Sequence, residues 1–166
     1  GTQLGDGREG DGPGEDDLHR LLLRRFREWP GLVQAAWSSQ NLDRLRTVYR
    51  AGRDAGRTLA VDLYTAELAR ASGARDVPLP GNPGLEVHCR LRERIRVKES
   101  GELGRIAAIR HVRLFPEEIV RRGGELVLMF RPSMVGELER AGALDGALAI
   151  WSMWRGYRRK GASERR

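Results

Sequence analysis

The stretch VQAAWSSQNLDRLRTVYRAGRDAGRTLAVDLYTAE, residues 33–67, determines how the rest of the chain is arranged. Two short apolar runs, at 32–37 and 58–63, are bounded by turn residues, which is typical of buried parallel strands. Between them, Leu45, Val48 and Tyr49 recur with the 3.6-residue period of a helix. The stretch therefore predicts a β-α-β unit.

Polar side chains fill the turn between the first strand and the helix of this unit. They are Ser38, Ser39, Gln40 and Asn41. A helix amino terminus favours an anion, because its backbone N–H groups are unpaired and the helix dipole is positive there. Ligands of open α/β sheets bind at such strand ends. Serine and asparagine are also the residues preferred as helix caps, so a phosphate contact and an ordinary N-cap both stay open.

The length of 166 residues predicts one domain with a real hydrophobic core. Lysine and arginine outnumber aspartate and glutamate by 30 to 23, giving a formal net charge of +7. This balance favours a polyanionic partner, with nucleic acid first. An arginine-rich composition also follows from a GC-rich genome, so the charge alone does not identify the partner.

Cysteine content and hydropathy indicate in which cellular compartment the protein is expected. Cys89 is the one cysteine, which excludes an internal disulfide framework and fits a reducing cytosol. No apolar run approaches the roughly 18 residues that a membrane span needs, and no signal peptide opens the chain. We expect a soluble, cytoplasmic protein with no membrane partner.

The ends of the chain differ in composition from its middle. Residues 1–14 are rich in glycine and charge and predict a flexible leader, 15–157 an α/β domain, and 158–166 a basic tail. The sequence opens at Gly1 without an initiator methionine. We interpret it as a fragment of a longer protein.

The remaining elements extend the same alternation. Five strands are expected, at 32–37, 58–61, 85–88, 125–130 and 147–151. Helices are expected at 15–29, between the first two strands through the periodic positions 45–52, and at 65–72, 90–110, 115–122 and 134–141. Strands that alternate with helices predict an open, doubly wound, mostly parallel sheet with helices on both faces.

Polar residues follow other strands as well. Asp62 closes the second strand, where it either caps the next helix, the favoured role, or reaches a ligand. Ser133, with Arg131 beside it, follows the fourth strand, and Ser152 and Arg155 follow the last. The carboxyl ends of parallel strands lie at one edge of a sheet, so we expect the three polar turns near residues 40, 133 and 152 to face one anion-binding cleft.

The predicted helix at 90–110 is strongly basic, with a weak point at its two glycines. Its basic residues are Arg90, Arg92, Arg94, Arg96, Lys98, Arg105 and Arg110, and its apolar residues, left to pack, are Leu91, Ile95, Leu103, Ile106 and Ile109. Two interpretations stay open: a solvated charged helix, or a groove along which a phosphate backbone lies.

Catalytic motifs are missing from the sequence. Three scattered histidines and one cysteine supply no recognisable metal-binding set. Neither a G-x-S-x-G elbow nor a Walker-type loop is present. The chain therefore reads as a binding part of an enzyme.

An ordered series of motifs resembles the β-CASP module of metallo-β-lactamase-fold hydrolases, the group that includes ribonuclease J. The series is GTQLG at 1–5, GEDDLHRLL at 14–22, SSQNLDRLRTVYRAGRDAGRTLAVDLYTAEL at 38–68, LVLMFRPSM at 126–134 and DGALAIWSMWRGY at 145–157. The resemblance covers nearly the whole chain to about residue 157.

This resemblance implies an insert that caps a two-zinc phosphodiesterase site and clamps single-stranded nucleic acid, with RNA favoured over DNA. By position, Glu15 matches the family's acid, with Asp16 and Asp17 as competitors. Ser38, Ser39 and Asn41 match residues that touch phosphate or nucleotide, and Ser152 lies in the turn that matches the last substrate-facing loop.

The family's metal motifs, HxHxDH and HxSGHA, are missing from this sequence. The resemblance thus implies no cofactor in this chain, zinc in the full-length protein, a metallo-β-lactamase domain as the missing partner, and no hydrolysis by the chain alone. A stand-alone nucleotide- or phosphate-binding module and an inactive remnant are the alternatives.

Overall fold

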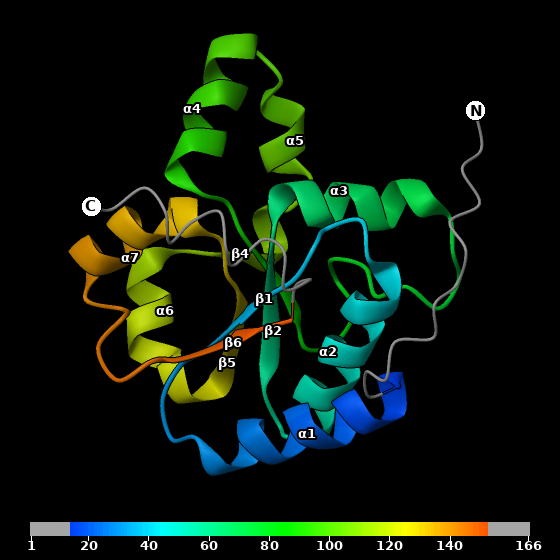
Figure 1. The fold of residues 1–166 in the computed structure, drawn as a ribbon. Helices are drawn as coiled ribbons and strands as arrows, with labels where there is room; N and C mark the ends of the chain where they lie inside the picture. Colours follow the sequence, from blue (N-terminus) through cyan, green and yellow to red (C-terminus); the bar gives the residue numbers. More distant parts are fainter. Residues whose placement is uncertain (1–13, 153–166) are drawn as a thin grey trace, which may run out of the picture.

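The computed structural model describes residues 14–152, which form a parallel sheet covered by helices on both faces (Figure 1). Leader residues 1–13 and the tail after Ser152, which includes Arg155, lie outside the described residues. The strands are β1 Val33–Ala36, β2 Thr58–Asp62, β3 Leu85–His88, β4 Arg113–Leu114, β5 Leu126–Met129 and β6 Leu148–Trp151. The α/β class expected from the sequence is confirmed.

Seven α-helices and three short 3₁₀ turns accompany the strands within residues 14–152, with the first α-helix before β1 and the others between strands. The helices are α1 Glu15–Glu28, α2 Leu42–Asp54, α3 Leu63–Ser72, α4 Leu91–Ser100, α5 Leu103–Ala107, α6 Pro116–Arg122 and α7 Val135–Ala141. The 3₁₀ turns are η1 Arg110–Val112, η2 Gly123–Glu125 and η3 Pro132–Met134. None of these helices is long and apolar enough to cross a membrane.

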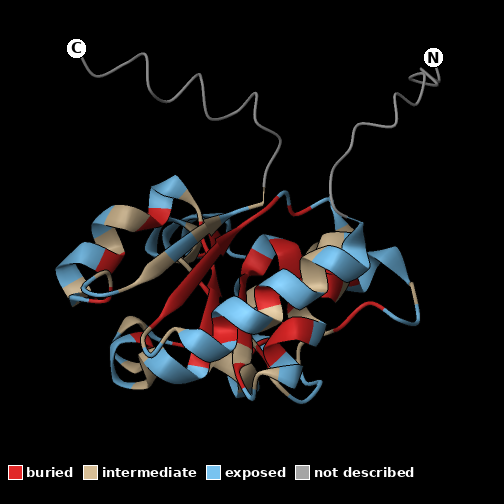
Figure 2. Cartoon of the chain, turned by 60° about the horizontal axis from the view of Figure 1, so that its bottom comes forward, coloured by how far each residue is buried: buried red, intermediate tan, exposed pale blue. Residues whose placement is uncertain are grey.

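Every strand pair in the sheet is parallel, and the strand order is β4-β3-β2-β5-β1-β6. β1 and β5 are buried along their whole length, as is typical of parallel strands covered on both faces, and every residue of the two strands except Gln34 is apolar. Side chains of β5 alternate between the two faces: Val127 and Met129 join the core under α1, α2 and α3, while Leu126 and Leu128 join the core under α6 and α7. Figure 2 shows these buried strands between the helices.

The sheet order creates a crevice at the carboxyl ends of the strands. After β1 and β2 the chain enters α2 and α3, which pack on one face, whereas after β5 it enters α7 on the other face. β5 lies between β1 and β2 in the sheet. Neighbouring strands therefore lead their chains to opposite faces, and such switch points are where open α/β sheets bind ligands.

Two details of the fold differ from the sequence-based expectation. The sheet has six strands rather than five, because Arg113 and Leu114 pair with β3 as the short edge strand β4. The expected helix at 90–110 was wrong: Gly101, at φ +75°, ends α4, and its N–H bonds to carbonyls of the last turn. Glycine adopts this left-handed conformation at low cost, so the chain reverses there into α5.

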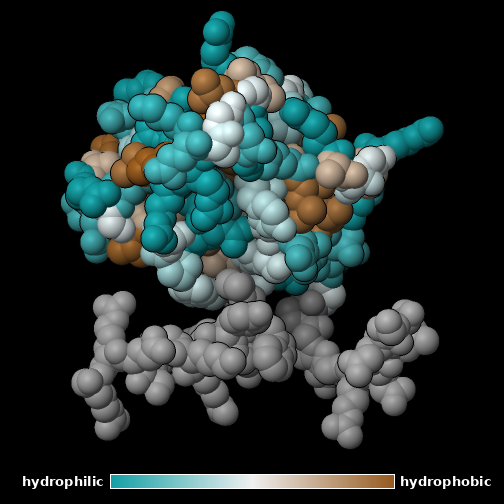
Figure 3. Space-filling model, turned by 90° about the horizontal axis from the view of Figure 1, so that it is seen from above, coloured by the Kyte–Doolittle hydropathy of each residue, from teal (hydrophilic) through white to brown (hydrophobic). Residues whose placement is uncertain are grey.

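The reversal makes α4 and α5 a helical hairpin that projects beyond the carboxyl edge of the sheet (Figure 1). Leu91, Ile95 and Leu103, expected to pack, are 39%, 47% and 60% exposed for this reason. Val97 and Ile109 do reach the core. Seen from above in Figure 3, this part of the surface is mostly hydrophilic, with separate hydrophobic side chains.

Candidate cleft at the carboxyl edge of the sheet

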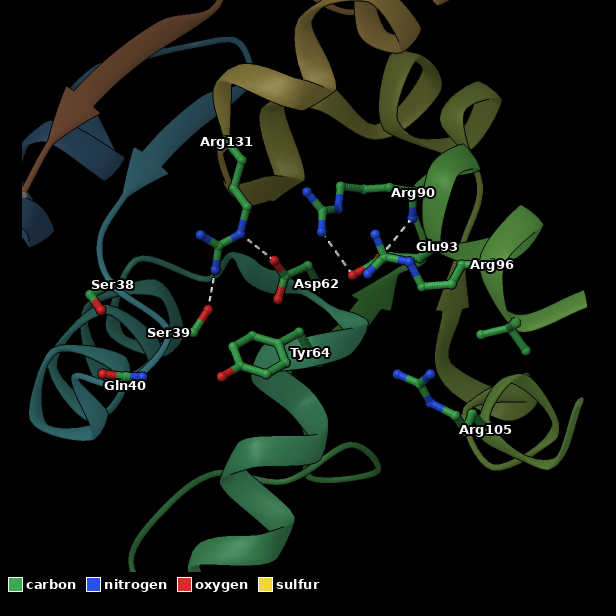
Figure 4. Close-up of a pocket in the computed structure, with 11 residues that line it drawn as sticks. Ser38, Ser39, Gln40, Asp62, Tyr64, Arg90, Glu93, Arg96, Arg105 and Arg131 are labelled. Atoms are coloured by element: carbon green, nitrogen blue, oxygen red, sulfur yellow. Dashed lines mark hydrogen bonds and ion pairs between the residues drawn. The ribbon is translucent and has the colours of Figure 1, made fainter. Parts of the chain in front are cut away.

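A cleft of about 600 Å³ lies at the carboxyl edge of the sheet (Figure 4). Its walls come from the turns after β1, β2, β3 and β5 and from the α4–α5 hairpin. The lining residues are Ser38, Ser39, Gln40, Asp62, Tyr64, Arg90, Glu93, Arg96, Val97, Arg105 and Arg131. We call this space the strand-end cleft.

The inner wall of the strand-end cleft is a closed hydrogen-bond network. Asp62 is fully buried, and its Oδ1 accepts a hydrogen bond of 2.8 Å from the backbone N–H of Thr65. Its Oδ2 accepts from Nε of Arg131, which also donates to Oγ of Ser39. The Ser39 and Thr65 hydroxyls lie 2.7 Å apart. Three neighbouring strand ends are thereby fixed relative to one another, and Asp62 both caps α3 and faces the cleft.

A second ion pair lies where β3 leads into α4. Nη2 of Arg90 donates to Glu93 at 2.9 Å, and Nη1 donates to Oγ of Ser133 at 2.7 Å. Burial opposes the charge of Arg90, but the hydrogen bond and charge of Glu93 outweigh it and raise the arginine's pKa. Ser133 thus reaches the cleft through Arg90 rather than by lining it.

The outer wall contains both a paired and an exposed arginine. Arg105 makes two hydrogen bonds, of 2.7 and 2.8 Å, to the carboxylate of Glu67 and one of 3.2 Å to Glu102, and these raise its pKa. Arg96 is exposed and has no carboxylate within ion-pair distance among residues 14–152. Tyr64, in the first turn of α3, is 47% exposed. In Figure 4, Arg96 and Arg105 lie across the cleft from Gln40 and Ser38, with Tyr64 between them.

The charge of the lining is positive. Four arginines and two carboxylates line the cleft, and Glu67 lies just outside the lining. Arg131 and Arg90 are each paired with a carboxylate of the cleft, and Arg105 is paired with Glu67. Among the described residues, Arg96 is therefore the arginine of the cleft whose positive charge is not balanced by a carboxylate. An anion in the cleft would find a cation without having to displace a carboxylate.

Other residues expected at the site lie outside the cleft. Asn41 is the N-cap of α2, since its Oδ1 accepts a 2.9 Å hydrogen bond from the backbone N–H of Arg44. The side chain of Arg44 donates to Glu15 at 3.2 Å and to the carbonyl oxygen of Ser152 at 3.1 Å. Arg44 thus links the start of α1 to the end of β6.

Glu15, the residue that matches the family's acid, faces α2. Thr47 donates a hydroxyl hydrogen bond of 2.5 Å to its carboxylate. Partial burial favours the protonated form, but the bonds from Thr47 and Arg44 outweigh it and lower the pKa of Glu15. It lines a separate hollow with Asp16, Asp43, Arg46, Thr47 and Arg50. The structure does not bring it to the strand-end cleft.

The turns near residues 40 and 133 therefore meet at the cleft, and the part of the third turn that the structure describes does not. Ser38, Ser39, Gln40 and Asp62 line the cleft, as expected. Tyr64, Glu93 and Val97 also line it but were not among the expected site residues, and Arg131 was noted only as the neighbour of Ser133. Tyr64 stands two positions after the end of β2, so a search of all strand-end positions would have found it.

Potential metal ligands do not converge in the part of the chain that the structure describes. Within residues 14–152, no group of three or more His, Cys, Asp or Glu side chains is placed to hold a metal ion. His88 is fully buried, with Nδ1 3.2 Å from the carbonyl oxygen of Leu114, and burial lowers its pKa. Burial also raises the pKa of the Cys89 thiol to about 11. These two residues are part of the packed interior.

Comparison of the sequence with models of known protein families finds no match, and comparison with curated proteins finds no similar protein. The β-CASP resemblance therefore rests on the quoted motifs.

Proposed function

We propose that this chain is the substrate-binding, β-CASP-like portion of a zinc-dependent metallo-β-lactamase-fold hydrolase that acts on nucleic-acid phosphodiesters. In this proposal the strand-end cleft holds the phosphate backbone of single-stranded nucleic acid, with RNA favoured. The main support is one observation: a cleft at the switch point of the sheet is lined by four arginines, of which Arg96 has no carboxylate partner among the described residues.

The geometry of the cleft suits a phosphate ligand. Its volume of about 600 Å³ falls within the range of ligand sites, roughly 300–1,000 Å³. Arginine presents several N–H donors in a planar fork that matches phosphate oxygens. Because the inner wall is held by its own hydrogen bonds, the cleft keeps its shape without a ligand, which reduces the entropy lost on binding.

Hydrolysis belongs to another part of the full-length protein in this proposal. The described residues offer no set of ligands that fits zinc, so we assign this chain no step of bond cleavage. Its contribution is to bind and orient the substrate beside a metallo-β-lactamase domain. We assign this activity to the cytoplasm, in keeping with the one cysteine of the chain.

A second candidate function is a stand-alone nucleotide-binding module. The self-contained network of Ser39, Asp62 and Arg131 favours it, because this wall of the cleft is complete without another domain. The two functions differ in the length of the ligand. A module of this kind would bind a mononucleotide as tightly as an oligonucleotide.

Fluorescence anisotropy with a labelled single-stranded RNA tests the proposal. Affinity should fall steeply between about 50 and 200 mM salt, because phosphate contacts release counterions. Arg96→Gln should weaken binding and reduce the salt slope by about 0.7, because one phosphate of the strand is no longer neutralised. Arg24→Gln is the matched control, since Arg24 is an exposed arginine of α1, far from the cleft lining.

The outcomes separate the candidates. RNA binding that is absent or indifferent to salt contradicts nucleic-acid binding. Equal effects of Arg96→Gln and Arg24→Gln place the phosphate outside the cleft. Equal affinity for adenosine monophosphate and for the RNA favours the stand-alone module.

A further inference from the structure

Tyr64 stands out among the first residues of α3. Its neighbours Leu63, Thr65 and Ala66 are buried, whereas Tyr64 is 47% exposed and lines the strand-end cleft. Within residues 14–152 its hydroxyl makes no side-chain hydrogen bond to another group. The ring therefore presents apolar surface to the cleft that the rest of the described chain leaves half uncovered.

Figure 4 shows the ring between the two kinds of polar wall. Ser39 and Gln40 lie on one side, and Arg96 and Arg105 lie on the other. Aromatic rings in a basic groove are the combination by which proteins bind single-stranded nucleic acid, because a base stacks on the ring while a cation of the groove meets the backbone phosphate.

We propose that Tyr64 is the stacking platform for one nucleobase of the bound strand and that Arg96 holds the phosphate next to it. The ligand of the cleft is then a nucleotide unit of a single strand rather than a bare phosphate. This inference rests on the function proposed above and adds recognition of the nucleobase, which the arginines do not provide.

The other arginines of the cleft are less suited to the direct phosphate contact. Arg131 is engaged with Asp62 and Ser39, and Arg90 with Glu93 and Ser133. A phosphate that took either arginine would leave a buried or half-buried carboxylate without its partner, which is unfavourable. Arg96 has no such partner in the described chain and can pair with a phosphate at no such cost.

Gln40 completes the subsite on the opposite wall. Its exposed amide carries both donors and acceptors and lines the same cleft as Tyr64. Such a group can pair with the edge of several bases, so we expect tolerance of base identity from this subsite. Stacking has the same property, since every base has a π-face.

The test compares two oligomers that carry the same number of phosphates: oligouridylate and an abasic ribose-phosphate strand of equal length. Tyr64→Ala should weaken binding of oligouridylate by about tenfold, in the range of stacking on one aromatic side chain. It should leave the abasic strand and the salt slope unchanged. Tyr64→Phe, which keeps the ring and removes the hydroxyl, should bind both strands as the unmodified chain does.

Each other result has a defined meaning. If the unmodified chain binds oligouridylate and Tyr64→Ala does not weaken it, stacking is contradicted while nucleic-acid binding stands. Equal weakening of both strands, or an equal loss in Tyr64→Phe, also overturns the stacking role. If the unmodified chain binds neither strand, the proposed function fails, and the stacking role fails with it. Thermal melting of each variant confirms that it is folded.

Discussion

The two edges of the sheet use arginine in opposite ways. At the amino edge, Arg57 at the start of β2 is 7% exposed and donates to the carbonyl oxygens of Phe26, Trp29, Gly31 and Leu126. These bonds tie the end of α1 to β5. At the carboxyl edge, the arginines of the strand-end cleft pair with carboxylates or face solvent.

The difference shows which arginines are available to a ligand. Burial lowers the pKa of Arg57, but its N–H groups meet backbone carbonyls, and no room remains for an anion. Arg96 has the opposite surroundings, since it is exposed beside a cleft and has no carboxylate partner among the described residues. A positive net charge therefore says little about binding until it is known which arginines are bonded within the protein and which are exposed to a ligand.

Replacing Arg57 should have the largest effect on stability. Arg57→Met leaves several buried carbonyl oxygens without donors, and we expect the free energy of unfolding to fall by about 3 kcal/mol. The melting temperature should fall by about 10 °C, which calorimetry can measure. Arg24→Met, at an exposed position of α1, should change stability by less than about 0.5 kcal/mol. If Arg57→Met lowers the free energy of unfolding only slightly, Arg57 does not have the structural role that distinguishes the amino edge from the carboxyl edge.

At the carboxyl edge, replacing the paired Arg131 should lower stability more than replacing the exposed Arg96. Arg131→Met removes the charged hydrogen-bond donor of the buried Asp62 carboxylate and should lower the free energy of unfolding by about 2 kcal/mol. Arg96→Met should change it by less than about 0.5 kcal/mol.

A second substitution sharpens this comparison. Adding Asp62→Asn to Arg131→Met removes the unpaired charge and keeps a side chain that can cap α3, so part of the lost stability should return. Urea denaturation measures all the variants. If the double variant is no more stable than Arg131→Met, the charge of Asp62 is not what Arg131 compensates.

The buried His88 should give a smaller, pH-dependent effect. Burial lowers its pKa, although Leu114, Glu137 and Glu93 favour the proton. The unfolded chain therefore binds more protons than the folded one, and stability should fall as the pH drops below the ordinary histidine value of about 6.5. His88→Asn should lose less stability than the unmodified chain between about pH 7 and pH 5. Parallel pH profiles would show that His88 does not titrate in this way.

The sequence predicted the elements whose patterns are strong and local. The β-α-β unit of residues 33–67 and the polar turn after β1 follow from periodicity and capping preferences. β4 was missed, since two residues carry no period. The α4–α5 hairpin was missed because a glycine within a helical pattern does not say whether the chain continues or reverses.

The candidate site was predictable at the strand ends and not beyond them. Ser39 and Asp62 were expected at the cleft because they follow strands. The partner of Asp62 is Arg131, 69 positions away, and this pairing follows from β5 lying between β1 and β2. Arg96 reaches the cleft on the α4–α5 hairpin, which the sequence pattern had predicted to be one helix. Strand order and chain reversal are properties of the fold that no local pattern in one sequence contains.

The central claim is that ligand binds at the carboxyl edge and not at the amino edge. A titration of the isotope-labelled chain with oligouridylate, followed by backbone amide NMR shifts, tests it directly. We expect the largest shifts at residues 38–40, 64, 96 and 105, with Arg57 and the end of α1 unchanged. Shifts that cluster on α1 or around Arg57, or that are absent at every concentration, would contradict the claim.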